Sequence, residues 1–282
     1  MAGVIETGGP GEKLKIYFLP NLMTAGNLFC GFLALTRIVE ANLDAPSPEY
    51  TSIRHALIFI LLACIFDLLD GRLARMGGEE SPFGREFDSL ADVVSFGVAP
   101  AFLVHRVVMK DVFTGHTEIG WFIASVYVIC GALRLARFNC MAAMNIKSSS
   151  SDFLGFPIPA AAGMVASVTL FILWWDEKEM ARGNWRFALP ALMVFLSLMM
   201  VSEVRYPSFK KLDFRQTKPF TKLVIAAMFF GLVLILWKKV LPIALPTFFT
   251  LYLIYGFIRP RISRKVRAEI EDEDEEEEAT QP

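Results

Sequence analysis

Long apolar blocks separated by short polar stretches run through most of this chain. About 20 helical residues are needed to cross the hydrocarbon core of a membrane, and most of the blocks approach that length. We expect eight membrane-spanning helices, at about Phe18–Val39, Ile53–Leu69, Phe87–Val108, Ile119–Phe138, Phe156–Trp175, Phe187–Val201, Leu223–Trp237 and Pro242–Ile258. The pattern therefore predicts an all-α fold, a polytopic transmembrane helix bundle.

Composition agrees with this prediction and argues against a separate soluble domain. Hydrophobic residues make up 54% of the 282 positions, and the mean hydropathy is +0.46. Soluble domains usually have a negative mean hydropathy, and no hydrophilic stretch of this chain is long enough to form one.

Basic residues indicate how the bundle is oriented, because cytoplasmic loops of membrane proteins are enriched in lysine and arginine. With eight spans, both termini share one side with the loops that follow the second, fourth and sixth spans. Most of the basic residues fall on that side, so we expect it to be cytoplasmic. The net charge of -1 conceals a basic body, since nine acids lie within Glu269–Glu278 and the rest of the chain carries +8. Such a body suits an anionic membrane surface, and no nucleic-acid partner is expected.

Four aspartates gather around the loop between the second and third blocks. Asp67 and Asp70 are three residues apart and share a helix face, and Asp88 and Asp92, four apart, share a face of the next helix. The short connection at 76–83 makes the two helices neighbours, so the four carboxylates are expected to converge.

Carboxylates that converge repel one another and stay ionised only with cations between them. Hard cations such as Mg²⁺ or Mn²⁺ prefer oxygen ligands, and two such ions can clamp a pyrophosphate during phosphoryl transfer. Gly71 and Gly84 leave room for a ligand near the backbone, and Arg75 can neutralise a phosphate. The alternative interpretation is a set of solvated caps at helix ends, but acids within spans are costly and usually functional.

This segment resembles the signature of the CDP-alcohol phosphotransferase family, D-x2-D-G-x2-A-R-x8-G-x3-D-x3-D. Every defined position matches, at Asp67, Asp70, Gly71, Ala74, Arg75, Gly84, Asp88 and Asp92. The resemblance implies a site for two metal ions at the cytoplasmic membrane edge, with the four aspartates as ligands and Asp92 also as the general base. It implies that Gly71, Ala74 and Gly84 line the CDP pocket. The family core has six spans, so two of the expected spans are additional.

Further segments resemble the phosphatidylserine synthase branch of this family. They are Leu19–Gly31, Val94–Pro100, Gly131–Asn139, Phe156–Ala162 and Tyr206–Lys210, and the resemblance covers most of Lys15–Lys211. It implies transfer of the phosphatidyl group from CDP-diacylglycerol to L-serine, giving phosphatidylserine and CMP by direct displacement. Sister enzymes that use glycerol phosphate, inositol phosphate or choline stay open as alternatives, as does a cation transporter that uses the acids as an ion pathway.

Several polar residues are candidates for binding the two substrates. Arg134 and Arg137 can pair with the serine carboxylate or the lipid phosphate, or they can be anchors at the membrane surface. Ser95 and Asn139 are candidates for hydrogen bonds to the serine amino or hydroxyl group. Asn21 and Thr24 lie at the start of the first span, where they can contact the cytidine or ribose or act as helix caps.

These interpretations give the expected organisation of the protein. A cytoplasmic segment at 1–15 precedes a transmembrane catalytic domain at 16–260, and a disordered cytoplasmic tail, basic and then acidic, follows at 261–282. The expected cofactors are two Mg²⁺ or Mn²⁺ ions, and the expected partners are CDP-diacylglycerol, L-serine, membrane lipids and a second copy of the chain. The expected location is the inner (cytoplasmic) membrane, with the active site facing the cytoplasm.

Overall fold

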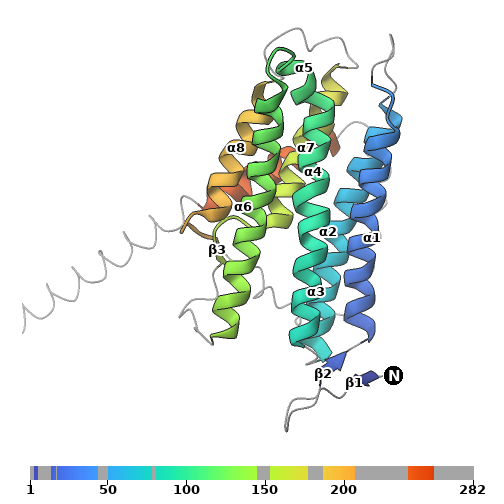
Figure 1. Cartoon of the computed structure of the whole chain (residues 1–282), viewed down its shortest axis with the longest axis vertical. Coiled ribbons are helices and arrows are strands. Elements are labelled where there is room, and N and C mark those ends of the chain that lie inside the picture. Colours follow the sequence, from blue (N-terminus) through green and yellow to red (C-terminus); the bar gives the residue numbers. More distant parts are fainter. Residues whose placement is uncertain are drawn as a thin grey trace, which may run out of the picture.

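The computed structural model is an elongated bundle of helices that lie side by side (Figure 1). It describes residues 3–5, 14–16, 18–43, 50–77, 81–144, 153–176, 187–206 and 241–256. Within these residues, five helices are long and apolar enough to cross a membrane, and two shorter apolar helices accompany them. The predicted transmembrane helix bundle is confirmed at this level. The expected span at Leu223–Trp237 lies outside the described residues.

The long helices follow the apolar blocks of the sequence closely. They are α1 (Phe18–Glu40), α2 (Thr51–Gly77), the continuous stretch Pro82–Val112, α6 (Thr117–Ala143) and α7 (Ile158–Asp176). The shorter ones are α8 (Ala188–Val201) and the helix Leu241–Gly256. α1 packs along α2, and α6 packs along α8. Because α2 continues past the expected end of its apolar block at Leu69, Asp67 and Asp70 lie inside this helix rather than at its end.

The third span is a composite helix whose start is fixed by a cap. The Gly84 backbone N–H donates to Ser81 Oγ at 3.0 Å, and Pro82 occupies the first helical turn, where its missing N–H costs nothing. The span contains α3 (Pro82–Asp92), η1 (Val93–Val98), α4 (Ala99–Val104), η2 (His105–Met109) and α5 (Lys110–Val112). The π-helical turn η1 follows Asp92 directly, and such turns are frequent at functional sites.

Large apolar side chains also cover the outside of the bundle. Phe29 and Phe32 of α1 are exposed, as are Trp121, Phe122 and Leu133 of α6. A helix that is apolar on its outer face as well as its buried face suits a lipid surrounding rather than water. The exposed apolar surface therefore agrees with the membrane prediction.

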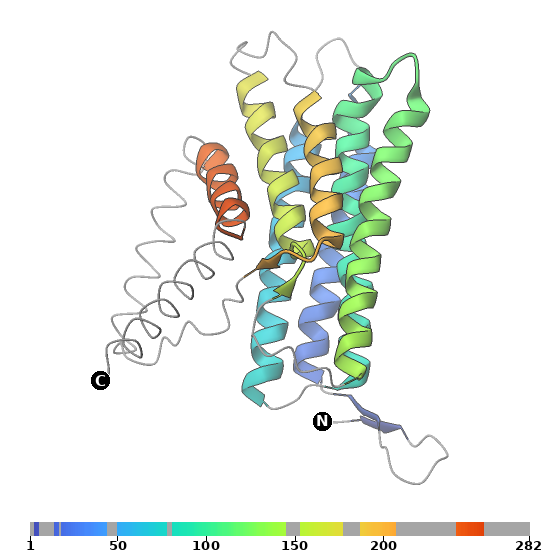
Figure 2. The same cartoon turned by 90° about the vertical axis from the view of Figure 1, so that its left-hand side faces the viewer.

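Two short strand pairs, which the sequence did not predict, complete the described fold. β1 (Gly3–Ile5) pairs with β2 (Leu14–Ile16), and β3 (Phe153–Leu154) pairs with β4 (Arg205–Tyr206), both antiparallel. Gly155 follows β3 with a φ of 75°, which only glycine adopts readily. Figure 2 shows β3 and β4 at mid-height, where α7 begins and α8 ends, while α2 and α6 continue past them.

The helix Leu241–Gly256 lies against the outside of α7 (Figure 2). Two glycines allow this close approach. A Cβ at Gly163 of α7 would collide with the Phe249 ring, and a Cβ at Gly256 would collide with the Tyr206 ring. The side chains of Thr250 and Met164 also meet across this contact. The helix therefore packs on the bundle through close contacts between these glycines and the facing aromatic rings.

Gly163→Ala should lower the melting temperature of the detergent-solubilised protein, because the added methyl group overpacks the docking contact at a cost of about 1–3 kcal/mol. Phe249→Ala makes room for that methyl group, so the double variant should be more stable than the sum of the two single changes predicts. Gly115→Ala is the matched control, since a Cβ there meets no atom of the described residues within 4 Å. A melting temperature for Gly163→Ala equal to that of the wild type would contradict the docking.

Candidate functional site

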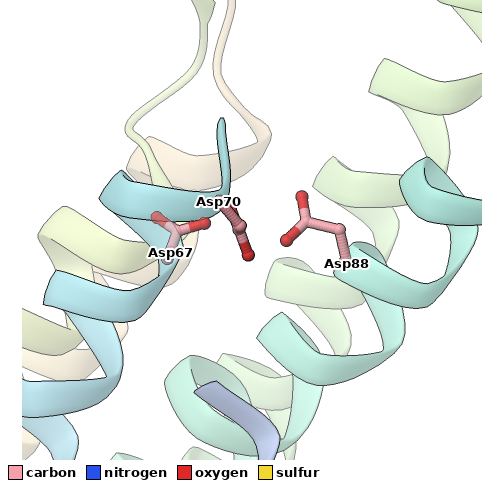
Figure 3. A group of neighbouring side chains, drawn as sticks. All are labelled: Asp67, Asp70 and Asp88. Carbon is pink, nitrogen blue, oxygen red and sulfur yellow. The ribbon is translucent and has the colours of Figure 1, made fainter. Parts of the chain in front are cut away.

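Three of the four predicted aspartates form one compact group between α2 and α3. Asp67 and Asp70 project from α2 toward Asp88 of α3 (Figure 3). One carboxylate oxygen from each lies within 4.8 Å of the other two. The spacing of three residues on α2 places both acids on the face that meets α3, as expected from helix geometry.

The first helix holds two of the aspartates in place by hydrogen bonds. Thr24 Oγ1 donates to Asp70 Oδ2 at 3.0 Å, and Asn27 Nδ2 donates to Asp92 Oδ1 at 3.0 Å. Thr24 and Asn27 are three residues apart on α1, so they present their side chains on one face. Asp70 and Asp92 are each only 5% exposed, so these hydrogen bonds lie in a largely desolvated region.

Asp92 lies one helical turn beyond Asp88 and is not part of the group of three. It is within electrostatic range of Asp67, Asp88 and Asp70. Its hydrogen bond to Asn27 was not foreseen, although an asparagine inside an apolar block, three residues after Thr24, is a signal in the sequence. The role of Asp92 as a fourth metal ligand stays a prediction.

The chemistry of the three carboxylates fits a divalent cation. Among the described residues, the buried Asp88 Oδ1 has no hydrogen-bond partner. A buried carboxylate oxygen without a partner is costly, and a hard cation between the acids would satisfy it. Asp67, Asp70 and Asp88 are therefore suited to hold Mg²⁺ or Mn²⁺.

The predicted nucleotide-binding residues lie on the three helices α1, α2 and α3, which also carry the aspartates or bond them. Gly71, Ala74 and Arg75 follow Asp70 on α2. A Cβ at Gly84 would lie 3.4 Å from Asn21 Oδ1, so Asn21 reaches the first turn of α3. Thr24 bonds Asp70, so of the two α1 candidates Thr24 touches the acidic group and Asn21 borders the start of α3.

The two predicted arginines of α6 have different surroundings. Arg137 donates through Nη1 to the Val201 carbonyl at 3.1 Å and through Nη2 to the Ser202 carbonyl at 3.3 Å. It therefore caps the C-terminal end of α8. Arg134 is 8% exposed and lies within electrostatic range of Asp92, and its Nε has no hydrogen-bond partner in the described part of the chain.

The two predicted serine-binding side chains already make hydrogen bonds within the protein. Ser95 Oγ donates to the Asn27 carbonyl at 2.9 Å, and Ser95 is fully buried. Asn139 Nδ2 donates to Glu86 Oε2 at 3.2 Å and to Ser89 Oγ at 3.0 Å. Ser95 therefore joins η1 to α1, and Asn139 joins α6 to α3. A direct contact of either residue with serine stays a prediction.

Comparison with known proteins agrees with this geometry. Residues 17–201 match the model of the CDP-alcohol phosphatidyltransferase family. The chain is 38% identical over 247 residues to a CDP-diacylglycerol–serine O-phosphatidyltransferase of Helicobacter pylori, covering 86% of this chain and 91% of that protein. It is 34% identical over 194 residues to the protein of the same name from Bacillus subtilis, covering 69% of this chain and 92% of that protein.

Another relative carries a different name. The chain is 33% identical over 191 residues to an archaetidylserine synthase of Methanothermobacter thermautotrophicus, covering 67% of this chain and 69% of that protein. The signature segment that contains the acidic group lies wholly within the residues that match the family model. The chain therefore belongs to the CDP-alcohol phosphatidyltransferase family.

Proposed function

We propose that this protein transfers the phosphatidyl group of CDP-diacylglycerol to L-serine, giving phosphatidylserine and CMP. The observation that carries the proposal is the convergence of Asp67, Asp70 and Asp88 at the spacing of the family signature. Relatives named for serine transfer, at up to 38% identity, support serine as the acceptor.

The proposed chemistry is a direct displacement at phosphorus. The serine hydroxyl oxygen bonds to the phosphorus of the phosphatidyl group, the bond from that phosphorus to the CMP oxygen breaks, and CMP leaves with the electron pair. Asp92 takes the proton of the serine hydroxyl, as a general base. Two divalent ions held by Asp67, Asp70 and Asp88 would neutralise the pyrophosphate and the charge that develops on it.

In this proposal, residues on α1, α2 and α3 bind the CDP group of the lipid substrate. Gly71, Ala74 and Gly84 leave space for the CDP group, and Arg75 pairs with one of its phosphates. Asn21 and Thr24 border the nucleotide from α1, since one reaches α3 and the other bonds Asp70.

Arg134 is assigned to the serine carboxylate, and Arg137 to the structure. The basis is the difference in their contacts: Arg137 already bonds two backbone carbonyls, whereas the buried Arg134 Nε has no partner among the described residues. A buried guanidinium beside the acids is suited to a bidentate carboxylate.

Arg134→Lys should raise the Michaelis constant for serine roughly 10- to 150-fold, because a charge-assisted hydrogen bond is worth about 1.5–3 kcal/mol and lysine lacks the planar fork. The Michaelis constant for CDP-diacylglycerol should stay within about twofold. Arg137→Lys is the control, and it should lower thermal stability more than serine affinity. A weaker interaction of Arg134→Lys with the lipid substrate and an unchanged one with serine would assign this arginine to phosphate.

The orientation and assembly complete the proposal. We place the acidic group at the cytoplasmic edge of the inner membrane in a homodimeric, multi-pass protein. The orientation is supported by the basic loops on the side of the acids, and the membrane by the apolar helices and the bacterial relatives.

The proposed acceptor is tested by supplying purified protein with CDP-diacylglycerol, Mg²⁺ or Mn²⁺ and a panel of alcohols. CMP release should require the metal and should be fastest with L-serine. Faster CMP release with glycerol phosphate, inositol phosphate or choline would identify that alcohol, rather than serine, as the acceptor. Absence of CMP release with every alcohol, together with metal-ion flux in proteoliposomes, would favour a transporter.

A further inference from the structure

Asn27 is fully buried in α1, and its side chain is bonded to the proposed base. Its Nδ2 donates to Asp92 Oδ1 at 3.0 Å. An ionised carboxylate can only accept hydrogen bonds, so the amide nitrogen of Asn27, rather than its amide oxygen, has to face Asp92. In a poorly solvated region a hydrogen bond to a charged group is strong, and this bond therefore restrains the Asp92 side chain.

The backbone of Asn27 is held against the third span as well. Ser95, three residues after Asp92, is fully buried and donates through Oγ to the Asn27 carbonyl at 2.9 Å. One turn after Asn27, a Cβ at Gly31 would collide with the side chain and the backbone of Ser95, so the two helices approach closely here. Two hydrogen bonds in opposite directions thus fix Asn27 relative to Asp92.

The amide oxygen of Asn27 is left without a partner. Oδ1 is enclosed and accepts no hydrogen bond from the described residues. A buried polar atom without a partner is destabilising, and a leucine of similar size would avoid that cost. Stability alone therefore does not account for an asparagine at this place in α1, whereas a donor for Asp92 does.

The bond from Asn27 occupies only one of the two oxygens of Asp92. Within the described residues Oδ2 makes no hydrogen bond, yet it is not fully enclosed, so it belongs to the 5% of Asp92 that is exposed. A base has to lie within hydrogen-bond reach of the proton that it takes, and small errors in orientation are costly to the rate. Holding Oδ1 in place directs Oδ2 to one position.

We propose that Asn27 is a positioning residue, which holds Asp92 so that Oδ2 faces the hydroxyl of the acceptor. The hydroxyl proton passes to Oδ2 as the hydroxyl oxygen bonds to phosphorus and CMP leaves with the electron pair of the broken bond. Asn27 keeps both of its amide protons throughout. The inference rests on the proposed function, because it takes Asp92 as the general base.

Asn27→Leu tests the inference, because leucine has a similar shape and cannot donate a hydrogen bond. The kcat of CMP release should fall about 10- to 100-fold, the size expected for loss of a hydrogen bond to a charged group. The Michaelis constant for CDP-diacylglycerol and the Mn²⁺ concentration for half-maximal activity should stay within about twofold, because neither depends on the proton transfer. Asn27→Ala, which cannot clash with its neighbours, should give the same loss of kcat.

Thr169→Val is the matched control for the loss of one buried side-chain hydrogen bond. Thr169 is 1% exposed, and its Oγ1 donates within α7 to the Val165 carbonyl at 2.7 Å. The control should keep the wild-type kcat. Asn27→Leu should melt no lower than this control, since it also removes the enclosed amide oxygen.

A double-mutant cycle shows whether Asn27 acts through Asp92. In the Asp92→Asn background, Asn27→Leu should change the residual kcat by less than about twofold, because no carboxylate base is left to position. Wild-type kcat in both Asn27 variants, or free-energy losses that add fully in the double variant, would overturn the inference. Recovery of kcat at high Mn²⁺ concentration would also overturn it, since Asn27 would then support a metal ligand.

The same variants separate this inference from the proposed function. Loss of turnover in Asp92→Asn with wild-type turnover in Asn27→Leu rejects the role of Asn27 and leaves the base assignment standing. Near-normal turnover in Asp92→Asn, or a wild-type protein that releases no CMP with serine, rejects the proposed function itself.

Discussion

Asp88→Asn should reduce the rate of CMP release by at least about a thousand-fold, because a metal-held charge contributes several kcal/mol to the transition state. Asp88 supplies the buried Oδ1 that has no hydrogen-bond partner among the described residues, and its carboxylate completes the group with Asp67 and Asp70. Asparagine keeps the shape of the side chain and removes the negative charge that a divalent ion requires.

The loss should be accompanied by a higher Mn²⁺ concentration for half-maximal activity, if any activity is measurable. Asp111→Asn is the matched control, because Asp111 lies in α5 at the other end of the same span. It should retain full activity and an unchanged metal requirement. Wild-type turnover and metal dependence in Asp88→Asn would remove Asp88 from the metal site.

Asp92→Asn should lower kcat by about 100- to 10,000-fold, the usual contribution of general acid–base catalysis. The binding of CDP-diacylglycerol should change little. The new side chain retains an oxygen that can accept the hydrogen bond from Asn27, so the packing of α1 on the third span should persist. Equilibrium binding of the lipid, measured beside turnover, separates the two effects.

The outcome for Asp92 also decides between its two predicted roles. Loss of turnover with normal Mn²⁺ binding identifies the base. Loss of Mn²⁺ binding in Asp92→Asn would make Asp92 a metal ligand first, and near-normal turnover would exclude it from the chemistry.

Much of the fold was predictable from the apolar blocks, but the helix ends were not. An apolar block indicates which residues lie in the hydrocarbon core, whereas a helix ends where its backbone groups find other hydrogen-bond partners. α2 therefore continues through a polar stretch with good helix formers to Gly77, beyond Leu69. The third span begins at Pro82 because Ser81 caps it, although the apolar block begins only at Phe87.

The acidic group was predictable because it depends on local spacing alone. Residues three or four apart on a helix share a face, and a short loop brings two helices together, so Asp67, Asp70 and Asp88 meet. The different roles of Arg134 and Arg137 were not predictable in this way. They also lie three apart, and only the carbonyls of Val201 and Ser202, more than 60 residues later in the chain, distinguish them.

The contacts of Tyr252 with Phe156 and Tyr206 were hidden from the sequence for the same reason. Nothing in the Leu241–Gly256 segment distinguishes Tyr252 from Tyr255 except the direction that each faces on the helix. Gly163 and Gly256 select that direction through their close contacts with Phe249 and Tyr206. Such long-range complementarity appears only when the chain is folded.

Anomalous X-ray scattering from crystals grown with Mn²⁺ and CDP-diacylglycerol tests the central claim most directly, because it locates the metal itself. We predict two manganese peaks bounded by Asp67, Asp70 and Asp88, with carboxylate oxygens at roughly 2.0–2.6 Å. Protein from the same preparation should release CMP on addition of serine. Active protein whose crystals show no manganese peak between these three aspartates would contradict the account.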